Sequence, residues 1–298
     1  IKGIVGKYPN RGKQIITTSL EHSSILEPLH QLENQGYHIR YVHLLQDGTV
    51  DLVHLKKLLE EEDTVLVSIA MVSSEVGILQ PIEEIGEIIK EYPKCFFHSD
   101  ITQALGKVPV SLHNVDLASF SAHKFYGLKG IGGLVKKEKV ELKPLFDGGK
   151  STTRYRSGTP ALALITSLAK ALRLSLETIN VEYVKQLNEK IQMELKEIPD
   201  VHINSTSQSI PHILNISIHG VKPETLLHAL EEKDIYISTM SACSSSQSES
   251  LAVKSVTHNT LDATTSIRIS LSIYTTQEEV NTFLKAFKEV IVKLRLRS

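Results

Sequence analysis

The chain has 298 residues, a formal net charge of −1 and a hydrophobic content of 41%, an ordinary globular composition that permits a large core and more than one domain. The near-neutral charge, without a basic face or a block of like charges, argues against a nucleic-acid-binding or membrane-surface protein. No apolar run approaches the ~20 residues that a membrane-spanning helix needs.

Short apolar runs alternate with amphipathic segments through the first half of the chain. Residues 1–8 read as the end of a helix, so we expect this sequence to begin inside a longer protein. Strands are predicted at 14–18, 40–45, 64–69, 94–99, 116–120 and 131–135. Helices are predicted at 24–35, 53–62 and 81–91. This alternation predicts βαβ units, and therefore an α/β fold with a mainly parallel central sheet and helices on both faces.

The pattern changes after residue 159. Helices are predicted at 161–182, 184–198, 223–233 and 277–294. Strands are predicted at 213–218 and 266–271. We therefore expect a large domain over residues 1–165 and a smaller α+β domain over residues 166–298.

The two cysteines differ in their surroundings. Cys95 lies in a buried-strand pattern and is read as a core residue, whereas Cys243 lies in the small, polar run 238–248. Two cysteines cannot supply a disulfide framework for a chain of this size, so we expect a reducing, cytoplasmic compartment. A thiol in a small polar run is accessible, which is unusual for a structural cysteine.

A lysine and an acid in the first half are candidates for a cofactor site. Lys124 lies in the turn 121–127, and Asp100 follows an apolar run. A lysine amine can form a Schiff base with the aldehyde of pyridoxal phosphate (PLP), and an acid can pair with its pyridinium nitrogen. Taken alone, Lys124 reads equally well as a surface lysine and Asp100 as a helix N-cap. Together, with Ser121 and His123 as phosphate-binding donors, they predict a PLP site.

Other polar residues also follow predicted strands, at the edge where ligands bind in open parallel sheets. His22 is read either as a capping residue or as an imidazole that stacks on the pyridine ring and relays protons. Gln103, one turn beyond Asp100, can reach the phenolic oxygen of the cofactor. Arg268 is read either as an edge-strand charge or as a bidentate partner for a substrate carboxylate.

Several segments match, in order, those of one enzyme family. They are 18–22, 68–77, 98–106, 119–134, 156–159, 211–218, 241–243 and 267–276. Together they resemble the cysteine desulfurases of the NifS/IscS type, which belong to the class V aminotransferases of PLP fold type I. The combination of a Ser-x-His-Lys turn, a Ser-Ala-Cys loop and an Arg-x-Ser strand is more specific than any one of its parts.

The resemblance assigns the cofactor contacts to particular positions. They are Lys124, Asp100, Gln103, His22, Ser121, His123 and Thr159. By this resemblance Lys124 binds PLP covalently, and Thr159 comes from the partner subunit of a homodimer. No metal is expected.

The resemblance also implies a reaction. Arg268 would bind the carboxylate of L-cysteine, Ser74 would contact the substrate, and Lys124 would remove its α-proton. Cys243 would take the sulfur as a persulfide, which leaves L-alanine. The persulfide would pass to an acceptor protein, in iron–sulfur cluster assembly or tRNA thiolation.

Some family features are absent or altered, and they leave alternatives open. The family's N-terminal quarter, which holds a phosphate-binding Gly-Ala-Thr-Glu turn, would lie before Ile1. Ser73-Ser74-Glu75 stands where the family has Asn-Asn-Glu, and residues 148–153 depart from the family's Gly-Gly-Gly-(Gln/His)-Glu-Arg stretch. The alternative functions are a selenocysteine lyase and a non-catalytic paralogue that acts as a binding partner.

Overall fold

The computed structural model describes residues 1–149, 152–239 and 249–296. The chain divides into two compact units, which are described separately. The first unit comprises Ile1–Leu45, Val50–Val72 and Gln80–Ile179. The second comprises Gln46–Thr49, Ser73–Leu79 and Asn180–Ser298.

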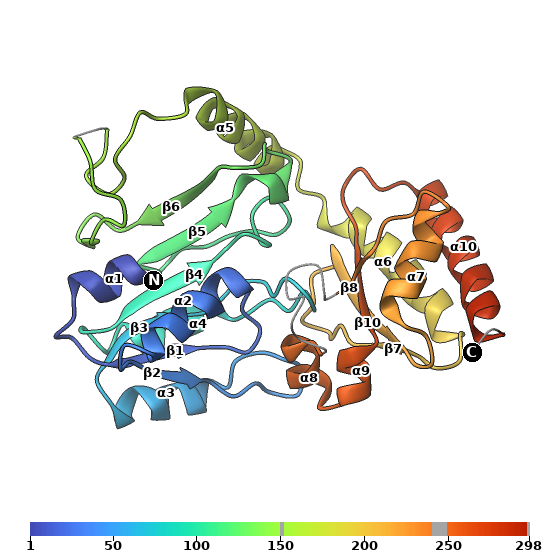
Figure 1. Ribbon diagram of the computed structural model, residues 1–298, viewed down its shortest axis with the longest axis horizontal. Coiled ribbons are helices and arrows are strands. Elements are labelled where there is room, and N and C mark those ends of the chain that lie inside the picture. Colours follow the sequence, from blue (N-terminus) through green and yellow to red (C-terminus); the bar gives the residue numbers. More distant parts are fainter. Residues whose placement is uncertain (150–151, 240–248, 297–298) are drawn as a thin grey trace. The chain divides into compact units, whose positions relative to one another are not determined.

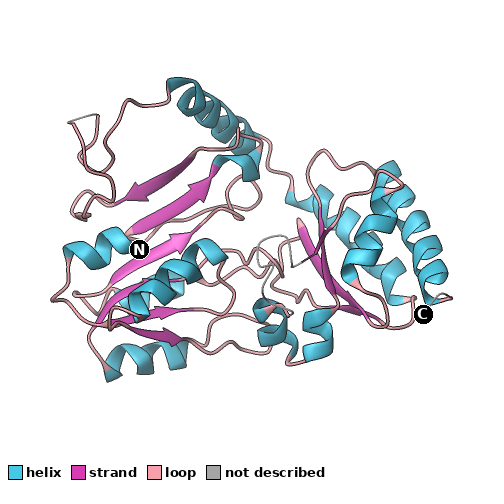
Figure 2. Ribbon diagram, in the orientation of Figure 1, coloured by secondary structure: helices cyan, strands magenta, loops and turns pink. Residues whose placement is uncertain are grey.

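The first unit is a sheet with helices between its strands (Figures 1 and 2). Its elements are α1 (Lys2–Lys7), β1 (Gln14–Thr17), α2 (Ser23–Glu33), β2 (His38–Tyr41), α3 (Leu52–Glu61), β3 (Thr64–Ser68), α4 (Ile82–Ile89), β4 (Phe96–Asp100), β5 (Leu117–Ser121), the 3-10 helix η1 (Ala122–Phe125), β6 (Gly132–Lys136) and α5 (Leu162–Glu177). The six strands run in the order β2-β1-β3-β4-β5-β6. All neighbours pair in parallel except β5 and β6. The predicted α/β fold with a mainly parallel sheet is therefore confirmed.

The register of the parallel strands decides which side chains share a face. Leu66 of β3 pairs with Phe96 of β4, and Ser68 pairs with His98. Side chains alternate along a strand, so His98 and Asp100 lie on the same face as Phe96. The apolar side chains of α1 and α2 pack into one core cluster with Leu66 and Phe96 on this face. The polar end of β4 therefore emerges beside the N-terminus of α2.

The second unit is a four-stranded sheet with a helical layer. Its elements are α6 (Val181–Lys196), β7 (Val201–Ile203), β8 (Ile213–Ile218), α7 (Pro223–Glu231), β9 (Ser238–Thr239), α8 (Leu251–Thr257), α9 (Thr260–Thr264), β10 (Ser266–Ser270) and α10 (Gln277–Arg295). The strand order is β7-β8-β10-β9, and all pairs are antiparallel. Apolar residues of α6, α7 and α10 form a core with alternate residues of β8 and β10. The opposite face of β8 carries the buried polar residues Asn215 and Ser217.

The break between the two helices that follow residue 159 lies earlier in the chain than the sequence predicts, which is between residues 182 and 184. α5 ends at Glu177, and Asn180 caps a new helix because its side chain accepts a hydrogen bond from the N–H of Tyr183. α5 belongs to the first unit, since Ser175 Oγ donates to the carbonyl of Phe125 at 3.0 Å. The division by contacts falls after Ile179, whereas the sequence pattern places the domain boundary between residues 165 and 166.

Other differences concern short or exposed elements. The strand expected at 40–45 is an exposed edge strand at His38–Tyr41. The sequence reading missed β7, β9, α8 and α9, which have two to seven residues each. Such short elements give too few apolar repeats for a period to be recognised. Among the described residues, no helix combines the length and the apolarity that crossing a membrane requires.

Candidate active site

The end of β4 presents the carboxylate of Asp100. Its Oδ1 accepts a hydrogen bond from the N–H of Thr102 at 2.9 Å, which fixes the side chain in an Asx-type turn. Asp100 is half-buried, and its main-chain carbonyl accepts from the N–H of Met71. The acid is therefore held by its own strand end and by the loop after the neighbouring strand.

Lys124 lies on η1, the tight turn that follows β5. The turn is closed by a hydrogen bond from Gly127 N–H to Ala122 O at 2.9 Å, and Phe125 is buried beneath it. A Cβ at position 127 would meet the Cβ of Ala122 at 2.8 Å, so only glycine fits without a shift. Tyr126 takes the left-handed conformation, with φ of 68°. Lys124 is thus presented from a turn with a fixed backbone.

The neighbours of Lys124 on this turn are polar and accessible. Ser121 ends β5 and is half-buried, and His123 is exposed. Partial burial lowers the pKa of His123, and the charges of Lys124 and Lys129 lower it further. The structure therefore places Ser121, His123 and Lys124 within four successive positions of one turn.

His22 and Gln103 are also placed by local contacts. His22 is the N-cap of α2, and its Nδ1 accepts from the N–H of Ser24 at 3.1 Å. In the neutral ring the proton then sits on Nε2. Gln103 is buried, and its Oε1 accepts from Lys107 Nζ at 2.6 Å, which leaves its NH₂ group as the donor end of the amide.

A cavity of about 820 Å³ opens on the α2 face of the first unit. Asp100 and Ser121 both line it, together with Ser24 of α2. Ser119 and His98 lie deeper on the same face. The other five predicted cofactor residues of this unit are not part of the lining; they are His22, Gln103, His123, Lys124 and Thr159.

Arg268 and Ser74 lie together in the second unit. Arg268 Nη1 donates to the carbonyl of Ser74 at 2.9 Å, and Nη2 donates to Ser238 Oγ at 3.1 Å. The guanidinium is half-buried on β10, directly across from Ser238 in the β9–β10 register. It is therefore oriented by two contacts rather than left as a flexible edge charge. The contact made by Ser74 is through its main chain.

The predicted roles of Thr159 and Cys243 are not tested by the described residues. Thr159 is exposed, and nothing in the described chain tests its predicted role across a dimer. Cys243 lies outside the described residues. Cys95 is buried, and burial raises the pKa of its thiol far above the usual range, which agrees with its interpretation as a core residue.

The sequence reading missed two buried ionisable groups next to this site. Glu21 precedes His22, and its Oε1 accepts from Thr18 Oγ1 and from the N–H of Ala70, both at 2.8 Å. Burial, together with a smaller effect of the charge of Asp100, raises the pKa of Glu21 to about 8 against the lowering effect of these two hydrogen bonds. Oε2 of Glu21 has no hydrogen-bond partner among the described residues.

The second missed group is His98, two residues before Asp100 on the same face. Its ring nitrogens contact Ser68 Oγ and Ser119 Oγ, each at 2.9 Å. Burial lowers the pKa of His98 to about 3, so the ring is neutral at physiological pH. Only the pairing register shows that these two hydroxyls flank the ring.

One protein-family model matches most of this chain. The family model described as aminotransferase class-V matches residues 1–283. The chain belongs to the aminotransferase class-V family. Enzymes of this family depend on PLP, which agrees with the cofactor that Lys124 and Asp100 predict.

Class-V relatives among the curated proteins have closely related sequences. A "NifS/IcsS protein homolog" of Lactobacillus delbrueckii subsp. bulgaricus is 42% identical over 301 residues, which cover 97% of this chain and 77% of that protein. "Cysteine desulfurase IscS" of Dictyoglomus turgidum is 38% identical over 302 residues, which cover 99% of this chain and 76% of that protein. The chain thus spans about three quarters of the length of these relatives.

Solved class-V structures share the fold. A "NifS-like protein" superposes with a TM-score of 0.90 at 34% identity, covering 98% of this chain and 78% of that one. A NifS-like protein of Rickettsia africae superposes with a TM-score of 0.85 at 31% identity, covering 97% of this chain and 78% of that one. These matches confirm the predicted PLP fold type I.

The first unit carries a donor set that fits PLP. The Asp100 carboxylate can accept the proton of the pyridine nitrogen, and the Gln103 NH₂ group can donate to the phenolic oxygen. The Ser121 hydroxyl can donate to phosphate, and the Lys124 amine can bind the aldehyde. Each functional group of the cofactor therefore has a chemically matched residue in this unit.

Proposed function

We propose that this class-V enzyme is a PLP-dependent cysteine desulfurase that converts L-cysteine to L-alanine and takes up the sulfur on Cys243. The proposal rests on what each unit contains by itself: a PLP donor set with Lys124 and Asp100 in the first unit, and in the second unit an arginine, Arg268, that two hydrogen bonds orient. The similarity to relatives named cysteine desulfurase supports the choice of substrate.

When bound, PLP supplies an electron-withdrawing ring that stabilises negative charge on the substrate's Cα. The Asp100 carboxylate, fixed by Thr102, favours the protonated pyridine nitrogen and so strengthens that withdrawal. The Lys124 amine takes the α-proton of the substrate, and its rigid turn keeps the amine in place for this transfer. His22 presents its ring from the N-terminus of α2 for stacking on the cofactor.

Arg268 binds the carboxylate of the amino-acid substrate. Its contacts with Ser74 and Ser238 hold the guanidinium plane before substrate arrives, so less side-chain entropy is lost on binding. A planar guanidinium matches a carboxylate with two parallel hydrogen bonds, which a lysine at this position would not reproduce.

Cys243 is the sulfur acceptor. Its thiolate attacks the sulfur of the substrate, the Cβ–S bond breaks, and an S–S bond forms on the enzyme. The electron pair of the broken bond takes up a proton at Cβ, so that the products are alanine and an enzyme persulfide. No external oxidant or reductant is required, because the two-electron oxidation of the sulfurs to a persulfide is balanced by the reduction of Cβ to the methyl group of alanine.

The proposed function also implies an oligomeric state, a sulfur acceptor and a cellular compartment. We infer a homodimer in which Thr159 contacts the phosphate bound by the partner subunit. The persulfide passes to an acceptor protein for iron–sulfur cluster assembly or tRNA thiolation, in the cytoplasm. The names of the similar IscS proteins support an acceptor of the first kind.

Mass spectrometry tests the proposal directly. Purified protein loaded with PLP is incubated with L-cysteine, alanine is quantified, and the protein is digested to locate any added sulfur. We expect one alanine per sulfur transferred, with the additional 32 Da (one sulfur atom) on the peptide that contains Cys243. Alanine without sulfur on Cys243 would refute Cys243 as the acceptor, and turnover of selenocysteine alone would support a selenocysteine lyase.

A further inference from the structure

A short segment of the second unit, Ser73–Leu79, is held in place by hydrogen bonds that its main-chain carbonyl groups accept. The four successive carbonyls and their donors are Ser74 with Arg268 Nη1 (2.9 Å), Glu75 with Asn215 Nδ2 (3.1 Å), Val76 with Ser209 Oγ (2.7 Å) and Gly77 with Ile210 N–H (2.8 Å). Gly77 has a φ of 76°, and a Cβ there would meet Ile213 at 3.0 Å. The segment is therefore a rigid part of the second unit.

The side chain of Glu75 makes a contact of its own. Its Oε2 accepts from Ser250 Oγ at 2.6 Å, across 175 residues of sequence. A distance of 2.6 Å between the two oxygens is typical of a hydroxyl that donates to a carboxylate. Ser250 is 1% exposed, so this bond is shielded from competing water.

Ser250 has a second set of bonds that fixes its orientation. Its Oγ accepts from the N–H of Val253, which makes it the N-cap of α8, and its own N–H donates to the carbonyl of Ala263 in α9. The hydroxyl proton is thereby directed to Glu75. The N-cap bond does not require Glu75, so loss of the carboxylate removes one contact without removing the cap.

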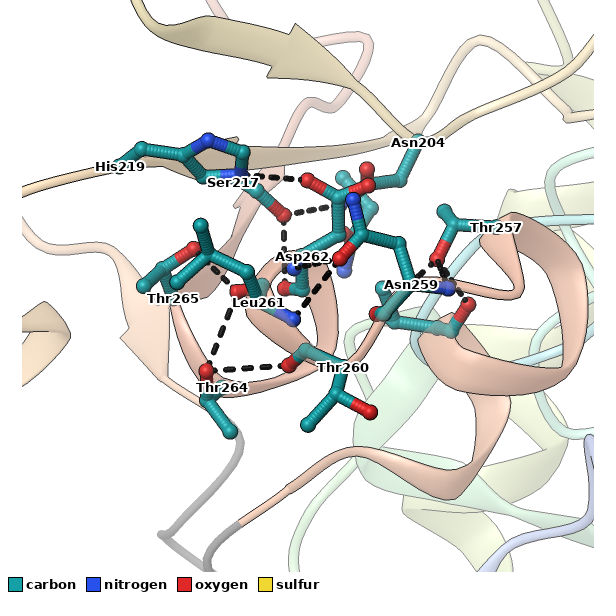
Figure 3. Close-up of polar contacts among 12 residues, drawn as sticks. Asn204, Ser217, His219, Thr257, Asn259, Thr260, Leu261, Asp262, Thr264 and Thr265 are labelled. Carbon is teal, nitrogen blue, oxygen red and sulfur yellow. Dashed lines mark hydrogen bonds and ion pairs between the residues drawn. The ribbon is translucent and has the colours of Figure 1, made fainter.

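α9 is attached to the sheet by a separate polar network (Figure 3). Asp262 Oδ1 contacts His219 Nε2 at 2.7 Å, and the carbonyl of Asp262 accepts from Ser217 Oγ at 2.8 Å. Asn204 Nδ2 donates to the same hydroxyl at 2.6 Å. α8 and α9 therefore stay attached to β8 when the contact with Glu75 is broken.

The segment 240–248 contains Cys243, and its two described flanks are tied to two adjacent residues, Ser74 and Glu75. On the amino-terminal side Ser238 is tied through Arg268 to the carbonyl of Ser74. On the carboxyl-terminal side Ser250 is tied directly to the carboxylate of Glu75. Ser74 and Glu75 are adjacent, so the flanks converge on one rigid site in the second unit.

We propose that Glu75 is a positioning residue for sulfur transfer: it fixes Ser250 and thereby the carboxyl-terminal attachment of the segment that contains Cys243. The proposal rests on the proposed function, because it assigns Cys243 the role of sulfur acceptor. Glu75 acts through Ser250 and not on the substrate. Its loss changes the rate of sulfur uptake, while carboxylate binding by Arg268 is preserved.

The experiment compares Glu75→Gln, Ser250→Ala and the double variant with the wild-type holoenzyme. Glu279→Gln is the matched control, because Glu279 Oε2 likewise accepts from the N-cap hydroxyl of a helix, Thr276 of α10. Two readouts are collected: amide hydrogen exchange of residues 249–257, and kcat and KM for alanine formation from L-cysteine.

We expect exchange at 249–257 to rise about tenfold in Glu75→Gln, which loses the charge-assisted bond, and at least as much in Ser250→Ala, which also loses the N-cap bond from Val253. We expect kcat to fall by about the same factor as exchange rises in Glu75→Gln, with KM within about twofold of wild type. The double variant should be no worse than Ser250→Ala, because Ser250→Ala already removes the bond to Glu75. Glu279→Gln should change neither readout.

Unchanged exchange in Glu75→Gln, additive losses in the double variant, or a change in KM alone would overturn the proposal. If Glu75→Gln does not fold, Ser250→Gly gives the same decision, because it removes the hydroxyl that donates to Glu75 while glycine costs little at a helix N-cap. If the wild type forms no alanine, the proposed function fails, and unchanged exchange would separately show that Glu75 does not hold Ser250.

Discussion

The two units position their functional side chains in different ways. In the first unit several side chains of the PLP set are held by near neighbours in sequence: Asp100 by Thr102, His22 by Ser24 and Gln103 by Lys107. In the second unit Arg268 is held by Ser74, which lies 194 residues away, and by Ser238, 30 residues away. A parallel sheet brings successive strand ends to one edge, whereas the antiparallel unit needs contacts between distant segments.

This difference has a consequence for the effects of substitution. A local support such as Thr102 acts on one side chain, whereas Ser74 and Glu75 support contacts made by several segments. We therefore expect losses in the first unit to affect cofactor binding and proton transfer, and losses in the second to affect substrate binding and sulfur uptake.

The largest effect is expected for Lys124→Ala in the first unit. The variant should lack the visible absorbance of the covalent lysine–PLP bond, and alanine formation should fall by roughly 10²–10⁴-fold because the proton acceptor is lost. Absorption spectroscopy with added PLP measures the first effect. Lys129→Ala, on the same loop, is the control, and a retained lysine–PLP band in Lys124→Ala would refute the assignment.

A loss of similar size but different kind is expected for Cys243→Ser. The PLP absorbance should be unchanged while sulfur uptake from L-cysteine is abolished, since a hydroxyl does not form the persulfide. Cys95→Ala is the control, because Cys95 is buried in the first unit. Persulfide assays on both variants decide the role; undiminished sulfur release from Cys243→Ser would contradict it.

An intermediate effect is expected for Arg268→Lys. A lysine cannot reproduce the bidentate contact, and a hydrogen bond to a charged group is worth roughly 1.5–3 kcal/mol, so KM should rise by roughly 10–100-fold. Steady-state kinetics with L-cysteine measure this change. Arg295→Lys is a control in the same unit, and an unaltered KM in Arg268→Lys would move carboxylate binding elsewhere.

The smallest effect concerns the pH dependence of stability in the first unit. The pKa of Glu21 is raised from 4.5 to about 8 in the folded state, so its contribution to stability is fully present below pH 4.5 and is lost as the pH rises through 8. Between pH 7 and 8 the free energy of unfolding should fall by about 1 kcal/mol more in wild type than in Glu21→Gln.

Urea unfolding at several pH values measures this slope. His98 does not obscure it, because burial lowers its folded-state pKa to about 3 and its unfolded pKa lies below this window. Equal slopes in wild type and Glu21→Gln would show that Glu21 ionises normally in the folded protein.

The sequence was sufficient for the features that depend on local pattern. Buried strand runs predict β3, β4 and β8, and polar residues after strand ends predict the grouping of Asp100 with Ser121. The exposed edge strand β2 is displaced from its predicted position, because a strand with one free edge has a weak apolar pattern.

Features that depend on distant contacts could not be predicted. The bond between Glu75 and Ser250 joins positions with no shared motif, and the raised pKa of Glu21 follows from burial that only the packed structure reveals. The division between α5 and α6 likewise depends on the packing of Ser175 against Phe125.

The most direct test of the account is the identity of the lysine that binds the cofactor. Purified protein is loaded with PLP, reduced with borohydride to make the lysine–cofactor bond permanent, digested and mapped by mass spectrometry. The account predicts that the modification lies on Lys124 and that addition of L-cysteine before reduction lowers its yield. Modification of a different lysine, or none at all, would contradict it.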